Sequence, residues 1–81
     1  MDARPRKRSL TLHGHRTSVS LEEPFWIELQ AMARAEGVSV NALAARIDRE
    51  RGVTAGLASA LRVAVLDRLR RLADPVADAA E

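Results

Sequence analysis

Apolar and polar residues alternate in two short runs near the amino end of the chain. Leu10 and Leu12 occupy even positions, whereas the later run, which contains Val19, follows odd ones. Side chains of a strand alternate between its two faces, so this change of parity requires a bulge or a turn. Gly14 is the natural place for it. The pattern leaves open one long bulged strand or a small hairpin, and it predicts a strand at about residues 15–21.

Two amphipathic helices follow, each with recognisable ends. Pro24 suits the first turn of a helix, where its missing N–H costs no hydrogen bond, and Gly37 suits a left-handed C-cap. The apolar spacing between them predicts a helix at about residues 24–36. Ser39 is a credible N-cap for a second helix at about residues 40–51.

A third helix is predicted in the segment of residues 52–73, with Thr54 as its N-cap. Val63 and Leu66 widen its apolar stripe, so this helix either packs between two others or forms part of a subunit interface. Residues 74–81 are expected to form a frayed tail, and no internal repeat is predicted. The residues that define the stripe recur at intervals of four and three: Leu57, Leu61, Val65, Leu69 and Leu72.

Size and composition restrict the fold class. The 81 residues make one small domain, and its apolar residues, 47% of the chain, are mostly Ala, Leu and Val. Such a core is thin, so we expect oligomerisation to supply further burial. A short strand without a strand partner in its own chain likewise indicates a homodimer in which the strands of two copies pair. The chain is therefore expected to be mainly α with one short strand.

The absence of cysteine excludes disulfides and fits a reducing cytoplasm. No apolar run approaches the roughly 20 residues that span a membrane, and no secretory signal is recognised. We therefore expect a cytoplasmic protein with no membrane partner.

The positive charge is concentrated at the amino end. Residues 1–16 carry a net charge of +4 and residues 17–81 a net charge of −2, within a total of +2. Residues 1–8 are expected to form a flexible basic arm. Such an arm binds a phosphate backbone or serves as a solubilising tail, and its composition favours neither. The side chains available for backbone contacts are Arg4, Arg6, Lys7 and Arg8.

The residues form no recognisable catalytic or cofactor-binding constellation. There is no phosphate-cradling glycine-rich loop, no nucleophile paired with a base and no tyrosine, so we expect no enzymatic activity and no cofactor. His13 and His15 would share one face of a strand, but without a third ligand they favour surface or interface roles over a metal site. Phe25 and Trp26 begin an apolar stripe, which favours core packing over base stacking.

The predicted strand has one face suited to nucleic acid. When Val19 and Leu21 face the helices, Arg16, Ser18 and Ser20 face away from them. In a two-stranded ribbon such side chains can reach base edges in the major groove of DNA. An ordinary solvated strand face has the same composition.

The turn before the second helix offers another site. The free N–H groups at the start of that helix, together with the Ser39 hydroxyl, can bind a phosphate oxygen and position a protein on DNA. The same serine needs no ligand when it acts as a plain helix cap.

These residues together resemble the ribbon-helix-helix family. The lead-in His-Gly-His-Arg-Thr-Ser-Val is similar to a bacterial subfamily of short, stand-alone members, and the resemblance covers about residues 15–51. The quoted pattern is Arg16-Thr-Ser-Val-Ser-Leu, then Phe25-Trp26, Leu29, Met32-Ala33, Gly37-x-Ser39 and Leu43. The resemblance implies an intertwined homodimer with an intermolecular antiparallel ribbon, built on a domain of residues 9–51. The helix in residues 52–73 is an addition to the minimal fold.

The resemblance also implies roles for individual positions. The base-facing residues would be Arg16, Ser18 and Ser20. Contacts to the DNA backbone would come from the second helix at Val38, Ser39 and Val40. The core shared by the two chains would consist of Val19, Leu21, Trp26, Leu29, Leu43 and Ile47.

The function implied by the resemblance is transcriptional regulation, with repression of a promoter by a homodimer that binds double-stranded DNA in the nucleoid. Two of the three base-facing residues are short serines, so base readout would depend on Arg16 or on bridging water. The alternative is a dimeric protein-interaction module, similar to an antitoxin, that binds a protein partner through the third helix or the basic arm.

Overall fold

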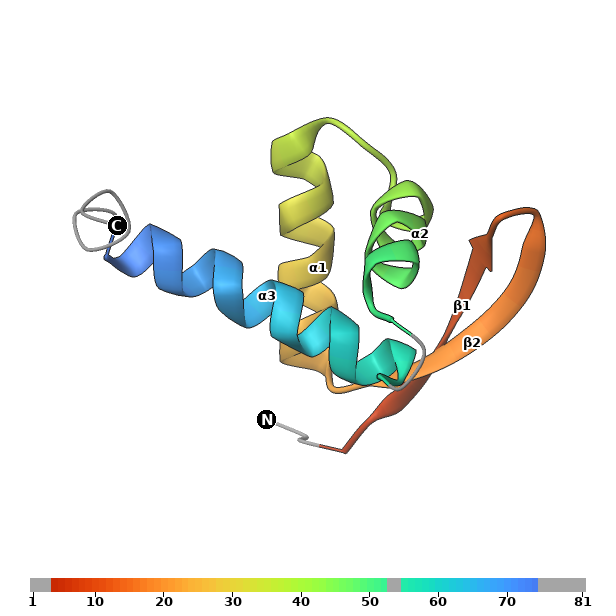
Figure 1. Ribbon diagram of the computed structural model, residues 1–81. Helices are drawn as coiled ribbons and strands as arrows, with labels where there is room; N and C mark the ends of the chain where they lie inside the picture. Colours follow the sequence, from red (N-terminus) through yellow and green to blue (C-terminus); the bar gives the residue numbers. More distant parts are fainter. Residues whose placement is uncertain (1–3, 53–54, 75–81) are drawn as a thin grey trace.

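The computed structural model describes residues 4–52 and 55–74, which form a β-hairpin followed by three helices (Figure 1). The elements are β1 (Arg6–Leu12), β2 (His15–Leu21), α1 (Glu23–Glu36), α2 (Val40–Glu50) and α3 (Leu57–Ala73). α2 lies between α1 and the hairpin, while α3 crosses α1 and its carboxyl half extends beyond it. None of the described helices is long and apolar enough to cross a membrane.

The hairpin resolves the change of parity in the amino-terminal pattern. β1 and β2 pair antiparallel, from Arg6 opposite Leu21 to Leu12 opposite His15. His13 and Gly14 join them with φ angles of 54° and 80°, the two left-handed residues of a tight hairpin turn. The expectation of a single strand without a partner in its own chain is therefore wrong, because β1 is that partner.

Part of the segment expected to be a flexible basic arm lies in β1. It begins at Arg6, so three of the four basic residues assigned to a flexible arm lie in a strand. This part of the strand was not recognisable from hydrophobic residues because its helix-facing positions are arginines, of which Arg8 is half-buried. Residues 1–3 lie outside the described residues.

The strand register reveals a repeat of nine residues that was not predicted. β1 is Arg-Lys-Arg-Ser-Leu-Thr-Leu and β2 is His-Arg-Thr-Ser-Val-Ser-Leu. From the second position, both strands carry a basic residue, a variable one, serine, an aliphatic residue, a hydroxyl residue and leucine. Because the strands are antiparallel and Ser9 lies opposite Ser18, a local two-fold axis through this pair relates the two copies.

The first two helices have the ends that their capping residues specify. Pro24 lies in the first turn of α1, and Gly37 ends the helix at φ 71°, with its N–H bonded to the carbonyl of Arg34 at 3.1 Å. At α2, the Ser39 hydroxyl accepts a hydrogen bond from the N–H of Ala42 at 3.0 Å.

α3 begins later than predicted. Gly56 occupies the N-cap position, so the helix start has no side-chain cap. Thr54, the predicted cap, lies outside the described residues, as do residues 75–81 of the expected tail. At the other end, the N–H of Asp74 bonds to the carbonyl of Arg70 at 3.0 Å.

A single apolar core joins the hairpin to all three helices. Five of the six residues expected in a shared dimer core are buried in it within one chain, and Trp26 is half-buried against it. A bidentate ion pair between Arg46 and Glu36, at 2.6 and 3.0 Å, joins α2 to the end of α1 outside the core. The buried residues are Leu10, Leu12, Val19, Leu21, Leu29, Met32, Ala33, Leu43, Ala44, Ile47, Leu61 and Val65.

Candidate functional site

The face of the hairpin that points away from the helices carries only basic and hydroxyl side chains. Arg16, Ser18 and Ser20 are exposed on it, where the period of β2 places them. β1 adds three further exposed residues, of which only Lys7 was anticipated from the sequence as a candidate contact. The facing pairs across the two strands are Lys7 and Ser20, Ser9 and Ser18, and Thr11 and Arg16. We call these six residues the polar hairpin face.

Ser9 and Thr11 could not be assigned from the sequence because their position depends on strand pairing. Once β1 pairs with β2 in the observed register, each comes to lie beside a predicted residue of β2. The nine-residue repeat is the signal in the sequence that would have identified them.

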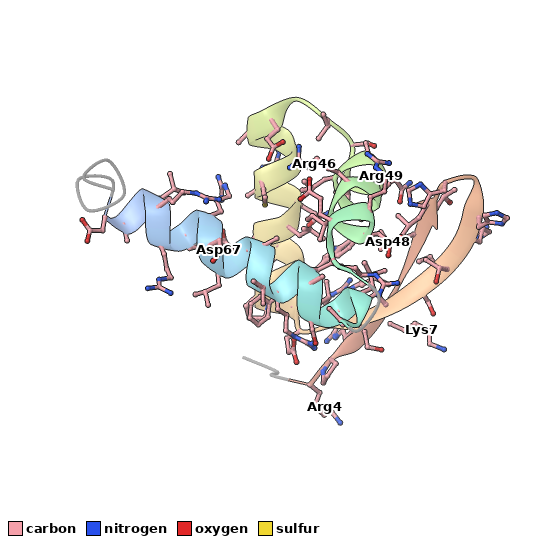
Figure 2. The ribbon with its side chains drawn as sticks, in the orientation of Figure 1. Arg4, Lys7, Arg46, Asp48, Arg49 and Asp67 are labelled. Carbon is pink, nitrogen blue, oxygen red and sulfur yellow. The ribbon has the colours of Figure 1, made fainter. Side chains whose placement is uncertain are left out.

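Arg8 differs from its neighbour Lys7 because it faces the helices. Its guanidinium donates a hydrogen bond to the carboxylate of Glu23 at 2.6 Å. The same group lies over the Trp26 ring, with 5.2 Å between Cζ and the ring centroid. Arg8 is thus held against α1, whereas Lys7 extends away from the helices (Figure 2).

The hairpin is fixed to α2 at its outer edge and at its tip. The N–H of Thr11 donates to the side-chain carbonyl of Asn41 at 3.0 Å, and His13 Nε2 lies 3.3 Å from a carboxylate oxygen of Asp48. Hydrogen bonding to Arg51, followed by the contact with His13, lowers the pKa of Asp48 below its usual range. These contacts attach β1 to the start of α2 and the hairpin turn to the carboxyl end of that helix.

The start of α2 retains donors that could contact an anion. Val38 and Ser39 are exposed and Val40 is half-buried. The Ser39 hydroxyl is already the acceptor for Ala42, so it acts as a cap here. The N–H groups of Val40 and Asn41, the first two of the helix, have no acceptor within the helix. They lie on the helix end that Asn41 joins to β1.

Arg62 of α3 fixes the opposite edge of the hairpin. Its guanidinium donates two hydrogen bonds to Glu22, at 2.9 and 3.1 Å, and a longer one to the carbonyl of Ser20 at 3.4 Å. It also lies 5.9 Å from the centroid of the Phe25 ring. The hydrogen bonds from Arg62 lower the pKa of Glu22 below its usual range. This arginine therefore joins α3 to the junction of β2 and α1.

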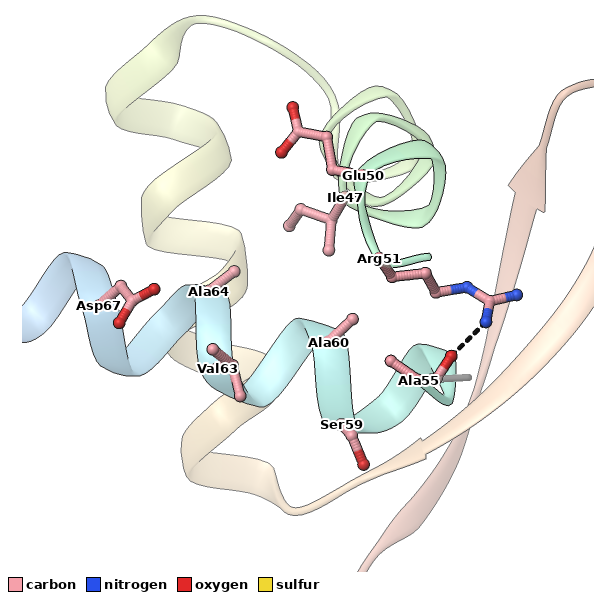
Figure 3. Close-up of a pocket in the computed structure, with 9 residues that line it drawn as sticks. All are labelled: Ile47, Glu50, Arg51, Ala55, Ser59, Ala60, Val63, Ala64 and Asp67. Atoms are coloured by element: carbon pink, nitrogen blue, oxygen red, sulfur yellow. Dashed lines mark hydrogen bonds between the residues drawn. The ribbon is translucent and has the colours of Figure 1, made fainter. Parts of the chain in front are cut away.

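α3 leaves an apolar row uncovered. Val63, Leu66, Leu69 and Leu72 follow one another every three residues, and between 38% and 62% of each is exposed. A cavity of about 380 Å³ adjoins Val63 between α2 and α3, with Ile47 and Ala60 among its apolar lining and carboxylates of Glu50 and Asp67 also lining it (Figure 3). α3 packs against both α1 and α2, as one of the two alternatives expected, and leaves this row exposed for the other, an interface.

The two histidines do not share a strand face. His13 lies in the turn and His15 opens β2, so the spacing argument for a common face does not apply. Within residues 4–52 and 55–74, no three histidine, cysteine or carboxylate side chains form a cluster that could hold a metal ion.

Comparisons with known proteins agree with this arrangement. A family model described as a ribbon-helix-helix domain matches residues 5–69. Among solved structures, the chain is similar to an uncharacterized protein from Bordetella pertussis Tohama I, with 36% sequence identity and a TM-score of 0.76. The match covers 90% of this chain, which spans 62% of the length of that protein. No curated protein matches the chain.

Proposed function

The chain belongs to the ribbon-helix-helix family, and on this premise we propose that it is a transcriptional regulator, a repressor, that binds double-stranded DNA in the nucleoid. The polar hairpin face enters the major groove, which accepts a two-stranded ribbon. The observation that carries the proposal is the composition of this face: six exposed side chains, two basic and four with hydroxyl groups, and no carboxylate. No residue is assigned a catalytic role.

Each part of the site has a distinct task in this proposal. Arg16, with Ser18 and Ser20, contacts base edges, because arginine pairs with guanine and hydroxyl groups pair with any base. Val38, Ser39 and Val40 bring the N–H groups at the start of α2 to a backbone phosphate. Arg4, Arg6 and Lys7 add a salt-sensitive attraction to the backbone at the open end of the hairpin. Arg8, expected to join them, faces the helices and is paired with Glu23.

The substitution Arg16→Ala tests the base contact. We expect it to weaken binding to the preferred duplex by about 1–3 kcal/mol, the value of one good base contact, and to relax the sequence preference. Selection of bound fragments from genomic DNA at physiological salt defines the preferred site, and titration of that duplex measures the loss. Arg71→Ala, which removes a charge from the exposed end of α3, is the control. An unchanged preference in the Arg16→Ala protein would refute base readout by this face.

We further propose that the regulator is a homodimer in which each chain contributes its own hairpin. β2 already has a strand partner, and a ribbon widened to four strands would measure roughly 14 Å between its outer strands at about 4.8 Å per strand spacing. That exceeds the roughly 12 Å width of the major groove. The intertwined arrangement, with an intermolecular ribbon and a shared core, would either form this four-stranded ribbon or require β1 to leave β2. The apolar row of α3 is the surface proposed for contact between copies.

The exposed apolar row also favours a second candidate function. As a dimeric interaction module, similar to an antitoxin, the protein would use the row on α3 to bind a different protein instead of a second copy. Exposure of Val63 at 55% and Leu66 at 50% is the observation that supports it. DNA binding that is uniform across sequences and disappears with added salt would favour this candidate over the regulator.

A further inference from the structure

Two carboxylates at the cavity between α2 and α3 have no cation beside them. Neither Glu50 nor Asp67 forms an ion pair within residues 4–52 and 55–74, and both line the cavity, whose walls are otherwise largely apolar. Five other described carboxylates each pair with an arginine: Glu22, Glu23, Glu28, Glu36 and Asp48. The cavity therefore combines an apolar lining with uncompensated negative charge.

Arg51 also lines the cavity, but its guanidinium is already engaged. It donates hydrogen bonds to Asp48, at 2.6 Å, and to the carbonyl of Ala55. Figure 3 shows this guanidinium on the side of the cavity opposite to Glu50 and Asp67. The two carboxylates are therefore available to a basic group that comes from another molecule.

The carboxyl half of α3 has the complementary charge together with exposed apolar side chains. Arg70 is exposed in the last turn and forms no ion pair with the described residues. Leu69 and Leu72 on either side of it are 38% and 62% exposed. This half of the helix extends beyond α1 (Figure 1), so a second molecule can reach it.

We propose that the cavity between α2 and α3 receives the carboxyl half of α3 from a second copy of the chain, with Arg70 of that copy placed between Glu50 and Asp67. This contact deepens the proposed homodimer, on which it rests, by naming the surface that each copy contributes. It uses neither strand of the hairpin, so a ribbon shared by two chains can form alongside it.

The spacing along α3 allows the contact to be reciprocal. Val63, which lines the cavity, and Arg70 are seven residues apart, or about 10 Å at roughly 1.5 Å per residue. Seven residues make just under two turns, so both lie on the same side of the helix. Two antiparallel α3 helices with a two-fold axis next to Leu66 therefore bring each Arg70 to the Val63 of the other copy. The small side chains of Ala60 and Ala64 in the cavity allow a close approach.

The charges determine the direction in which the two helices run. In the antiparallel pair Arg70 of one copy meets Asp67 of the other, and Leu66 packs next to the axis. A parallel pair in the same register would instead bring arginine to arginine and aspartate to aspartate, which is unfavourable at an interface. Apolar burial thus supplies the attraction, and the two charged residues select the antiparallel arrangement.

An exchange of charge between positions 67 and 70 of the full chain tests the contact. Asp67→Arg and Arg70→Asp each bring like charges together in the antiparallel pair, so each variant alone should self-associate at least about tenfold more weakly than the unmodified protein. An equal mixture of the two variants has opposite charges at both contacts and should regain the association. Sedimentation at a series of concentrations measures each constant. Arg34→Asp, at an exposed position of α1, is the charge-matched control and should associate normally.

The outcomes separate this contact from the proposals on which it rests. If each variant self-associates like the Arg34→Asp control, the contact is refuted, and the homodimer forms through another surface. If the mixture stays as weak as its components, positions 67 and 70 do not face each other and the contact is likewise refuted. If the unmodified protein is monomeric, the proposed homodimer fails with it, and a different protein becomes the occupant of α3. The Arg16→Ala experiment tests DNA binding independently.

Thermal unfolding of every variant separates a lost contact from a lost fold. The three substituted side chains are exposed, so the variants should unfold close to the Tm of the unmodified protein.

Discussion

Neighbouring basic residues of β1 have opposite surroundings because side chains alternate along a strand. Lys7 is exposed on the polar hairpin face, whereas Arg8 is half-buried between Glu23 and the Trp26 ring. The net charge near the amino end does not distinguish these two residues. Only the register of the hairpin shows that one charge is available to a partner and the other is neutralised by α1.

The left-handed conformation of Gly14 predicts a loss of stability on substitution. A Cβ atom at this position would meet no atom within 4 Å, so any penalty comes from the backbone at φ 80°. We expect Gly14→Ala to lower the free energy of unfolding by about 1–2 kcal/mol, the cost of the left-handed region for an L-residue. Urea denaturation measures the change.

D-alanine at position 14 is the matched control, and it is accessible by chemical synthesis of the chain. It has the same atoms as L-alanine but favours positive φ, so the D-variant should keep the stability of the unmodified protein. Equal losses for the two enantiomers would show that the turn does not impose this conformation.

The exposure of Arg16, Ser18 and Ser20 could be predicted from the sequence, because Val19 and Leu21 determine which face of a period-two strand is buried. The turn at Gly14 was recognisable from the change of parity. The roles of Ser9 and Thr11 were not predictable from the same pattern, since they depend on a cross-strand register. Asn41 was also missed, because a contact between its side chain and a strand edge leaves no periodic signal.

At the scale of elements, two polar contacts connect the hairpin edges to different helices. Asn41 of α2 holds β1, and Arg62 of α3 holds β2 while it also pairs with Glu22. α3 lies outside the minimal ribbon-helix-helix unit expected from the sequence, yet one of its side chains supports the candidate DNA-binding strand. The helix could be predicted from its apolar spacing, whereas this contact, between residues 42 apart, could not.

The pairing of Glu22 with Arg62 predicts a dependence of stability on pH. The folded-state pKa of Glu22 is below its ordinary value of 4.5. Its contribution to stability is therefore fully present above pH 4.5 and is lost as the pH falls through the lower folded-state value. We expect Glu22→Gln to lower stability near neutral pH and to flatten the loss of stability below pH 4.5, as followed by urea denaturation at a series of pH values.

A double-mutant cycle tests whether Arg62 is the cause. Arg62→Gln should flatten the acid limb in the same way, and the double variant should add little to either single change. Additive effects of the two substitutions would show that the residues act independently.

The hydrophobic core of the molecule is formed by residues of one chain. An intertwined dimer would unfold on dissociation, and a hundredfold dilution would lower its apparent stability by about 2.7 kcal/mol. Here the hairpin pairs internally and twelve of the residues in 4–52 and 55–74 are buried without a second copy. The ribbon-helix-helix fold and the three described helices followed from the sequence, but the second strand and its pairing within the chain did not.

We therefore expect the Tm to change little over a hundredfold dilution. Leu66→Glu, a change in the exposed row of α3, should weaken self-association and leave the monomer folded. Thermal unfolding at several concentrations and analytical ultracentrifugation measure the two properties. Leu61→Glu, at a fully buried position of the same helix, should instead unfold the chain. A Tm that falls steeply on dilution would support the intertwined arrangement.

The repeat within the hairpin has a consequence for how recognition can diverge. In a ribbon made from two identical strands, every codon change appears twice, so both ends of the ribbon must change together. In this hairpin Lys7 and Arg16 are encoded separately, and the strands already differ at Thr11 and Ser20. A single mutation can therefore change the exposed side chain at one end of the polar hairpin face and leave the other end unaltered.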